Sequence, residues 1–244
     1  MTVFTSTGDI DPFLHVALKQ GDKIYCESDA MVMMETTLDL KGRMTGGLGS
    51  AIMRRFANGE SFFQQHIEAV RGDGDCLLSP VLPGALQVID VGARQYILSD
   101  GAFVAATSST ELKVRMQSLG NALFAQSGGF FVMETSGTGQ VVVSGFGSMF
   151  QLDVVPGKDV IIDNSHVVCW DNTLHYEISV TTGSSSSSGG GLGGMLGNLV
   201  NSVTSGEGIV LRFSGSGKVF VCSRNRDAFV DWMKKETAGS RTSR

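Results

Sequence analysis

One frame occurs three times in this sequence, and it constrains the fold more than any other feature. The stretches GDKIYCESDAMVMM, GARQYILSDGAFVA and GKDVIIDNSHVVCW begin at Gly21, Gly92 and Gly157. In each stretch an apolar run follows the glycine, a polar pair stands at a shared offset, and a second apolar run comes next. Short apolar runs separated by turn residues are typical of β-strands. Each copy therefore predicts a strand, a turn and another strand.

A second frame alternates with the first. The stretches GDGDCLLS, GTGQVVVS and GSGKVFVC place Gly-x-Gly before three apolar residues, and they begin at Gly72, Gly137 and Gly215. Repetition at a fixed period is typical of modular folds, whose units gain stability by packing on their neighbours. The sequence therefore predicts one all-β domain with three tandem repeats. The domain covers residues 1–236, and the repeats cover about 12–83, 84–147 and 148–224.

The last glycine-rich stretch resembles a phosphate-binding loop because Lys218 follows its glycines. Asp75 and Gln140 stand at the same place in the other two copies, however, and neither is basic. A phosphate-binding loop also leads into a helix, whereas VFVCS after Lys218 is β-branched and aromatic. We therefore interpret this stretch as a turn between strands, with glycine supplying positive φ at a hairpin connection.

One helix is predicted at the C-terminal end, over residues 225–236. Asn225 is a suitable N-cap, and the following residues place Ala228, Phe229, Trp232 and Met233 on one face. The polar residues 237–244 are predicted to form a disordered tail.

Two irregular segments, 44–56 and 192–203, combine glycines with apolar residues at helical spacing. Packing within the domain or on another subunit is one interpretation. Contact with a membrane surface or a partner protein is the other, and Arg54 and Arg55 would suit anionic lipids. The sequence leaves both open.

The composition of the chain bears on its partners and on its location. The formal net charge is −5 and charged residues make up 18% of the chain, so we do not expect nucleic-acid binding. The four cysteines, Cys26, Cys76, Cys169 and Cys222, form no C-x-x-C pair and lie in or beside apolar runs, which indicates reduced thiols. The N-terminal residues lack the pattern of a secretory signal, and no apolar run is long enough to span a bilayer. We expect a cytoplasmic protein.

The strongest candidate for chemistry is the group His166, Cys169, Asp171 and His175. On one strand, an odd separation points His166 and Cys169 to opposite faces, which argues against a shared metal ion. The sequence contains neither the Gly-x-Ser-x-Gly motif of a nucleophile elbow nor the glycine fingerprint of a dinucleotide-binding fold. We therefore predict no catalytic, cofactor-binding or metal-binding residues and no enzymatic activity.

Several stretches resemble one family. The residues GEGIVLRFSGSGKVFVCSRNRDAFVDWM, SDAMVMM and NGESFFQQHIEA look like signatures of the altered-inheritance-of-mitochondria family, type twenty-four, known in bacteria as a domain of unknown function. The likeness covers about residues 12–235. It implies a fold like that of the tryptophan RNA-binding attenuation protein, with three short double-stranded, jelly-roll-like β-helix modules per chain in a ring-like homotrimer. No catalytic residue is carried over by the resemblance. Eukaryotic members are linked to mitochondrial inner-membrane organisation, and the absence of an Arg-rich transit segment fits a bacterial cytoplasmic form better.

Three functions follow from these observations. The first is a non-enzymatic scaffold or assembly protein that forms a ring-like homo-oligomer, because edge strands of repeated β-modules favour association. The second is a ring that binds a small molecule or nucleic acid between modules. The third is peripheral membrane association through the apolar segments.

Overall fold

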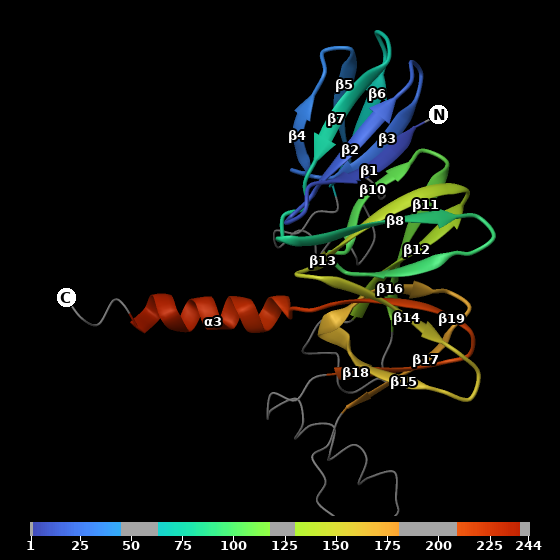
Figure 1. Ribbon diagram of the computed structural model, residues 1–244, viewed down its shortest axis with the longest axis vertical. Coiled ribbons are helices and arrows are strands. Elements are labelled where there is room, and N and C mark those ends of the chain that lie inside the picture. Colours follow the sequence, from blue (N-terminus) through green and yellow to red (C-terminus); the bar gives the residue numbers. More distant parts are fainter. Residues whose placement is uncertain (1, 45–62, 118–129, 181–208, 240–244) are drawn as a thin grey trace, which may run out of the picture.

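A computed structural model describes residues 2–44, 63–117, 130–180 and 209–239. The apolar segments predicted at 44–56 and 192–203, apart from Met44, lie outside the described residues, as do Arg54 and Arg55. The described part is built almost entirely from antiparallel strands, with one α-helix near the C-terminus (Figure 1). The predicted all-β class is therefore confirmed.

The strands fall into three sets of six, which we call units 1, 2 and 3. Strand β1 (Val3–Thr7) precedes unit 1. Unit 1 contains β2 (Phe13–Leu18), β3 (Lys23–Glu27), β4 (Met31–Met34), β5 (Leu38–Met44), β6 (Phe63–Ala69) and β7 (Gly74–Leu78). Unit 2 contains β8 (Gly84–Val91), β9 (Tyr96–Ser99), β10 (Phe103–Thr107), β11 (Thr110–Gln117), β12 (Phe130–Gly137) and β13 (Gly139–Phe146). Unit 3 contains β14 (Met149–Val154), β15 (Val160–Asp163), β16 (Val167–Asp171), β17 (His175–Val180), β18 (Ile209–Ser214) and β19 (Gly217–Cys222).

The same strand order recurs in each unit. One half of each unit is a triplet, namely β2-β7-β4, β8-β13-β10 and β14-β19-β16. The other half is β5-β6-β3, β11-β12-β9 and, at the end of the chain, β17-β18-β15. This recurrence supports the predicted repeat. The tandem double-stranded β-helix description, like the likeness to the attenuation protein, stays a prediction.

Neighbouring units share sheets. One six-stranded sheet joins β5-β6-β3 of unit 1 to β10-β13-β8 of unit 2, and another joins β11-β12-β9 of unit 2 to β16-β19-β14 of unit 3. A four-stranded sheet, β1-β2-β7-β4, and a three-stranded sheet, β15-β18-β17, complete the molecule. The units follow one another along the long axis of Figure 1.

Three apolar clusters fill the space between the sheets. The first includes Leu14, Ile24 and Cys76, the second Leu98 and Val141. The third is built around Trp170, Leu211 and Phe213. The strands supply these clusters by alternation, as in β2, where Leu14, Val16 and Leu18 are buried and the residues between them are not. Apolar burial of this kind is the main source of stability.

The Gly-x-Gly stretches are turns between strands, as predicted, but the hairpin prediction is wrong. Strand β18 pairs with β15 and β17, whereas β19 pairs with β14 and β16. The turn therefore carries the chain from one sheet to the next. Gly215 adopts φ +107°, and Lys218 lies in β19 rather than in a loop. Its Nζ donates a hydrogen bond to Oε1 of Gln151 at 3.4 Å.

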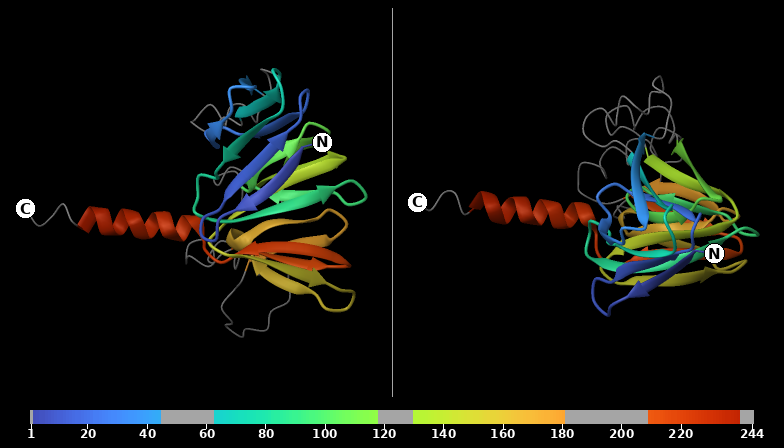
Figure 2. Two further views of the ribbon diagram at one scale, coloured as in Figure 1. Left: turned by 45° about the horizontal axis from the view of Figure 1, so that its top comes forward. Right: turned by 90° about the horizontal axis from the view of Figure 1, so that it is seen from above.

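The C-terminal helix, α3, spans Arg226–Gly239 and extends away from the strands in both views of Figure 2. Asn225 is its N-cap, because its Oδ1 accepts a hydrogen bond from the backbone N–H of Ala228 at 3.0 Å. Residues 237–239, predicted as part of the tail, are helical, and the Thr237 hydroxyl donates a hydrogen bond to the Met233 carbonyl oxygen one turn earlier. The remaining tail, 240–244, lies outside the described residues. No described helix has both the length and the apolar character needed to cross a membrane.

Candidate functional site

Units meet inside the chain through two antiparallel strand pairs, which we call the internal junctions. In the first, β10 pairs with β3, with Ala105 opposite Cys26 and Ala106 opposite Tyr25. In the second, β16 pairs with β9, with Cys169 opposite Leu98 and Trp170 opposite Ile97. The two junctions therefore use the same strands of the unit in the same relative register.

A β-bulge occurs at one place in all three units. Strand β10 is irregular between Phe103 and Ala105, β16 between Val167 and Cys169, and β4 between Met31 and Met33. The residue skipped by the pairing is a valine each time, namely Val104, Val168 and Val32. Val104 packs in the first apolar cluster, which belongs mainly to unit 1, and Val168 packs in the second, which belongs mainly to unit 2. Each of these valines thus completes the core of the preceding unit.

Strands β4 and β15 occupy the corresponding positions at the two ends of the chain, and we call them the terminal edges. Among the described strands β4 has only β7 as a neighbour, and β15 has only β18. Their counterparts at the internal junctions have a strand on each side. Figure 1 places β4 and β15 at opposite ends of the molecule.

Exposure differs sharply between equivalent positions. Val104 is 0% exposed and Val168 is 3% exposed, whereas Val32 is 52% exposed. Its neighbour Met33 is also exposed, while the matching Ala105 and Cys169 are fully buried. We call Val32, Met33 and the half-buried Leu77 of β7 the β4 patch.

The other terminal edge shows the same contrast. Ile161 of β15 is 66% exposed, while Tyr25, at the matching position of β3, is buried against the second cluster. Val160 and Ile162 are half-buried and pack on the third cluster. Exposed apolar residues on an edge strand, whose backbone groups are unpaired on one side, are typical of an interaction site.

Charges accompany the second internal junction. Nη1 of Arg94 lies 2.9 Å from Oδ2 of Asp171, whose side chain is only 2% exposed. Asp171 is the last residue of β16 and lies opposite Tyr96 of β9. Arg94 stands two residues before Tyr96 in the sequence. At the terminal edges the matching residues are Glu35, just after β4, and Lys158, two residues before β15.

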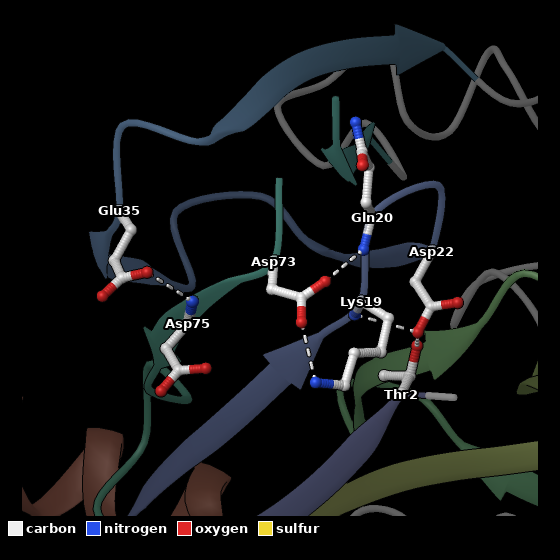
Figure 3. Close-up of polar contacts among 7 residues, drawn as sticks. All are labelled: Thr2, Lys19, Gln20, Asp22, Glu35, Asp73 and Asp75. Atoms are coloured by element: carbon white, nitrogen blue, oxygen red, sulfur yellow. Dashed lines mark hydrogen bonds and ion pairs between the residues drawn. The ribbon is translucent and has the colours of Figure 1, made fainter. Parts of the chain in front are cut away.

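The carboxylates near the end of β4 are held by local hydrogen bonds (Figure 3). Glu35 accepts from the backbone N–H of Asp75 at 3.2 Å. Asp73 accepts from Nζ of Lys19 at 2.7 Å, and this bond holds the pKa of Asp73 below its usual range. Asp22 accepts from the Thr2 hydroxyl at 3.1 Å. These contacts fix turns, and no three metal-ligating side chains of the described residues converge on a common point.

A carboxyl group with a shifted pKa lies at the end of β3. Burial, together with the negative charges of Asp100 and Asp29, raises the pKa of Glu27 to about 7. Glu27 therefore carries a proton over a wider pH range than an exposed glutamate.

The residues considered for chemistry are dispersed. His166 ends a 3-10 turn, η1 (Asn164–His166), and is not in the strand with Cys169, because the hydrogen bond from Ser165 to the Asp163 side chain starts a turn there. Nδ1 of His166 lies 2.8 Å from the Cys222 carbonyl oxygen. Cys169 is buried, and His175 is exposed, 3.7 Å from Glu177. Together with Asp171, which pairs with Arg94, these side chains have separate partners.

All four cysteines are free. Burial raises the pKa of Cys26 and of Cys76 to about 12, and it also raises the pKa of Cys169 and Cys222. A thiol with a raised pKa holds little thiolate at neutral pH and is a poor nucleophile. The cysteines thus act as core side chains, as the apolar runs around them suggested.

The terminal edges were not predicted from the sequence, although one signal was present. The three equivalent stretches MVMM, FVAA and VVCW each carry a valine at the bulge position. The missing information was which strands pair between units, and only the structure supplies it.

Comparisons with known proteins agree with this architecture. The family model described as "Mitochondrial biogenesis AIM24" matches residues 4–224. An uncharacterised protein of Streptococcus pyogenes serotype M6 is 33% identical over 230 residues, which cover 92% of this chain and 86% of that protein. A crystal structure of a Streptococcus pyogenes protein from a structural genomics consortium superposes with a TM-score of 0.75 at 31% identity, covering 97% of this chain and 100% of that one. The chain therefore belongs to the mitochondrial biogenesis AIM24 family.

Proposed function

We propose that the protein is a non-enzymatic assembly protein whose copies associate head to tail through the terminal edges β4 and β15. The observation that carries this proposal is the exposure of Val32, 52%, against 0% for Val104 and 3% for Val168. The same residue type at the same bulge is buried wherever a preceding unit is present. Among the described strands none pairs with β4 at this position, and another copy would supply one.

The physical driving force is apolar burial together with completion of a sheet. Burying a valine or methionine side chain fully contributes about 1.5–3 kcal/mol, and the β4 patch and Ile161 offer several such side chains. Pairing also satisfies the backbone N–H and C=O groups on the free sides of β4 and β15. Because the two edges differ, the contact is heterologous, and repetition of it gives a ring if the rotation closes. The family resemblance suggests a ring of three copies.

The other edge strands do not compete with this assignment. Strands β5, β11 and β17 end their sheets in all three units; β8 and β14 also end theirs, and β1 covers the equivalent β2, so none of these edges pairs one unit with another. Among the described strands, only the β3–β10 and β9–β16 positions are paired between units in the interior and open at the two ends. We further propose a cytoplasmic location, which the free thiols support.

The test compares matched Val→Lys variants by size-exclusion chromatography with light scattering. Val32→Lys places a charge on the β4 patch, whereas Val3→Lys places it on β1, at the opposite edge of the same sheet, at a valine that is 53% exposed. We expect the wild-type chain and Val3→Lys to form an oligomer at micromolar concentration, and Val32→Lys to be a monomer. A monomeric wild-type chain, or an unchanged oligomer of Val32→Lys, would contradict the proposal.

Membrane contact through residues 44–56 and 192–203 stays a prediction. Those segments lie outside the described residues apart from Met44, which ends β5.

A further inference from the structure

We infer that β15 of one copy adds to β4 of the next in one defined register, with Met34 opposite Ile161, and that Lys158 then meets Glu35 across the interface. This inference rests on the proposed head-to-tail association and specifies the contact surface. The partner is a second copy of this chain, presented through unit 1.

The register follows from the two internal junctions. Ala106 lies opposite Tyr25, and Trp170 lies opposite Ile97. Counted from the bulge valine, Met34 of β4 is the residue equivalent to Ala106 and Trp170. Tyr25 and Ile97 are the second residues of β3 and β9 in the junction pairings, and Ile161 is likewise the second residue of β15. Met33 then lies opposite Ile162.

The packing at this register is complementary. At the first internal junction the bulge valine enters the cluster around Ile24 and Cys26 of the preceding unit. The matching residues of unit 3 are Val160 and Ile162, which are half-buried on the third cluster and leave that cluster open at its edge. Val32 of the next copy would pack at this edge and cover the side chains of Val160 and Ile162.

The charges fit the same register. The ion pair of the second internal junction joins Arg94, two residues before β9, to Asp171 at the end of β16. Lys158 stands two residues before β15, and Glu35 follows the last residue of β4. Opposite charges therefore stand at both matching positions.

Closure within one chain is excluded by the arrangement of the units. Strands β4 and β15 lie at opposite ends of the long axis, separated by all three units (Figure 1). The inferred pairing is consequently intermolecular, and each copy contributes one β4 edge and one β15 edge.

Cysteine cross-linking tests the register. Because the native Cys76 lies opposite Met34 in the neighbouring strand, the β4 variants carry Cys76→Ala as well. A full-length Met34→Cys chain in this background is mixed with a full-length Ile161→Cys chain and oxidised, and disulfide-linked heterodimer is measured on non-reducing gels. We expect it to form well above the yield from Met31→Cys in the same background mixed with Ile161→Cys, which is out of register. An Ala105→Cys chain, which places a thiol opposite the native Cys26, reports whether such pairs oxidise at all.

Charge reversal gives a second readout. Glu35→Lys and Lys158→Glu should each weaken association about tenfold, and mixing the two variant chains, which places opposite charges at each contact between unlike chains, should recover most of it. Thermal melts of each variant show whether the monomer still folds, since Glu35 also accepts a hydrogen bond from Asp75.

The outcomes separate the two proposals. An oligomer that cross-links preferentially out of register, or whose charge-reversed chains show no recovery when mixed, would overturn the register while leaving head-to-tail assembly intact. A wild-type chain that is monomeric by light scattering would overturn both.

Discussion

The internal junction between β9 and β16 and the terminal edges β4 and β15 are built from the same strands of the unit, yet they differ in burial. At the junction, Leu98, Cys169 and Trp170 are fully buried. At the edges, Met33, the counterpart of Cys169, is exposed, and Ile162, the counterpart of Leu98, is only half-buried. The difference teaches that equivalent strands are buried where two units meet and more exposed at the two ends of the described strands.

The largest expected contrast comes from equivalent leucine and isoleucine truncations. Leu98→Ala removes a buried side chain from the internal junction and should lower the free energy of unfolding by about 2–5 kcal/mol. Ile162→Ala, at the matching place on β15, should cost about 1 kcal/mol in a dilute monomer, because that residue is only half-buried. Urea unfolding at low protein concentration measures both. Equal losses would mean that the terminal edge is as well packed as the junction.

The next contrast concerns the charges. Arg94→Ala leaves the Asp171 carboxylate buried without its cationic partner, so the free energy of unfolding should fall by about 1–3 kcal/mol. Lys158→Ala should change it by less than about 0.5 kcal/mol in the monomer, where the side chain is exposed. Urea unfolding again measures both. Similar losses in the free energy of unfolding for the two variants would show that the charge at the junction contributes no more to stability than the charge at the edge.

The smallest effect is a pH dependence at the first internal junction. The pKa of Glu27 is raised to about 7 in the fold from an ordinary value of 4.5, so the protonated form is favoured by folding. The stability it contributes is fully present below pH 4.5 and is lost as pH rises through about 7. Glu27→Gln should therefore raise the melting temperature by about 2–4 °C at pH 8.5, which corresponds to roughly 1 kcal/mol after allowance for partial exposure.

The comparison is made by thermal melts of Glu27→Gln and wild type at pH 8.5 and pH 5, with exposed Glu177→Gln as the control. The difference should shrink at pH 5, where the wild-type carboxyl is protonated. A gain that is the same at both pH values would show that charge at Glu27 is not the cause.

Much of the fold could be predicted, because local patterns determine strands. The glycine frames located the turns and most of the strands, and Asn225 marked the start of the helix. The hairpin interpretation failed because sequence neighbours such as β18 and β19 pair with other strands. Pairing between segments far apart in the sequence leaves no mark in a single chain.

The alignment of the three frames was also one residue out in unit 2. Cys26 stands five residues after Gly21, whereas Leu98, which pairs equivalently, stands six residues after Gly92. A single inserted residue in a turn leaves the glycines aligned and shifts the strand. The terminal edges were missed for a related reason, since MVMM reads as an ordinary core strand until its neighbour is known to be absent.

Complementation between two edge variants tests head-to-tail assembly most directly. Val32→Lys blocks β4 and leaves β15 intact, whereas Ile161→Lys blocks β15 and leaves β4 intact. Light scattering should find each variant alone as a monomer and the equimolar mixture as a dimer of twice the 25.9 kDa chain mass, because one intact pair of edges remains. A mixture that stays monomeric, or either variant alone assembling as the wild type does, would contradict the account.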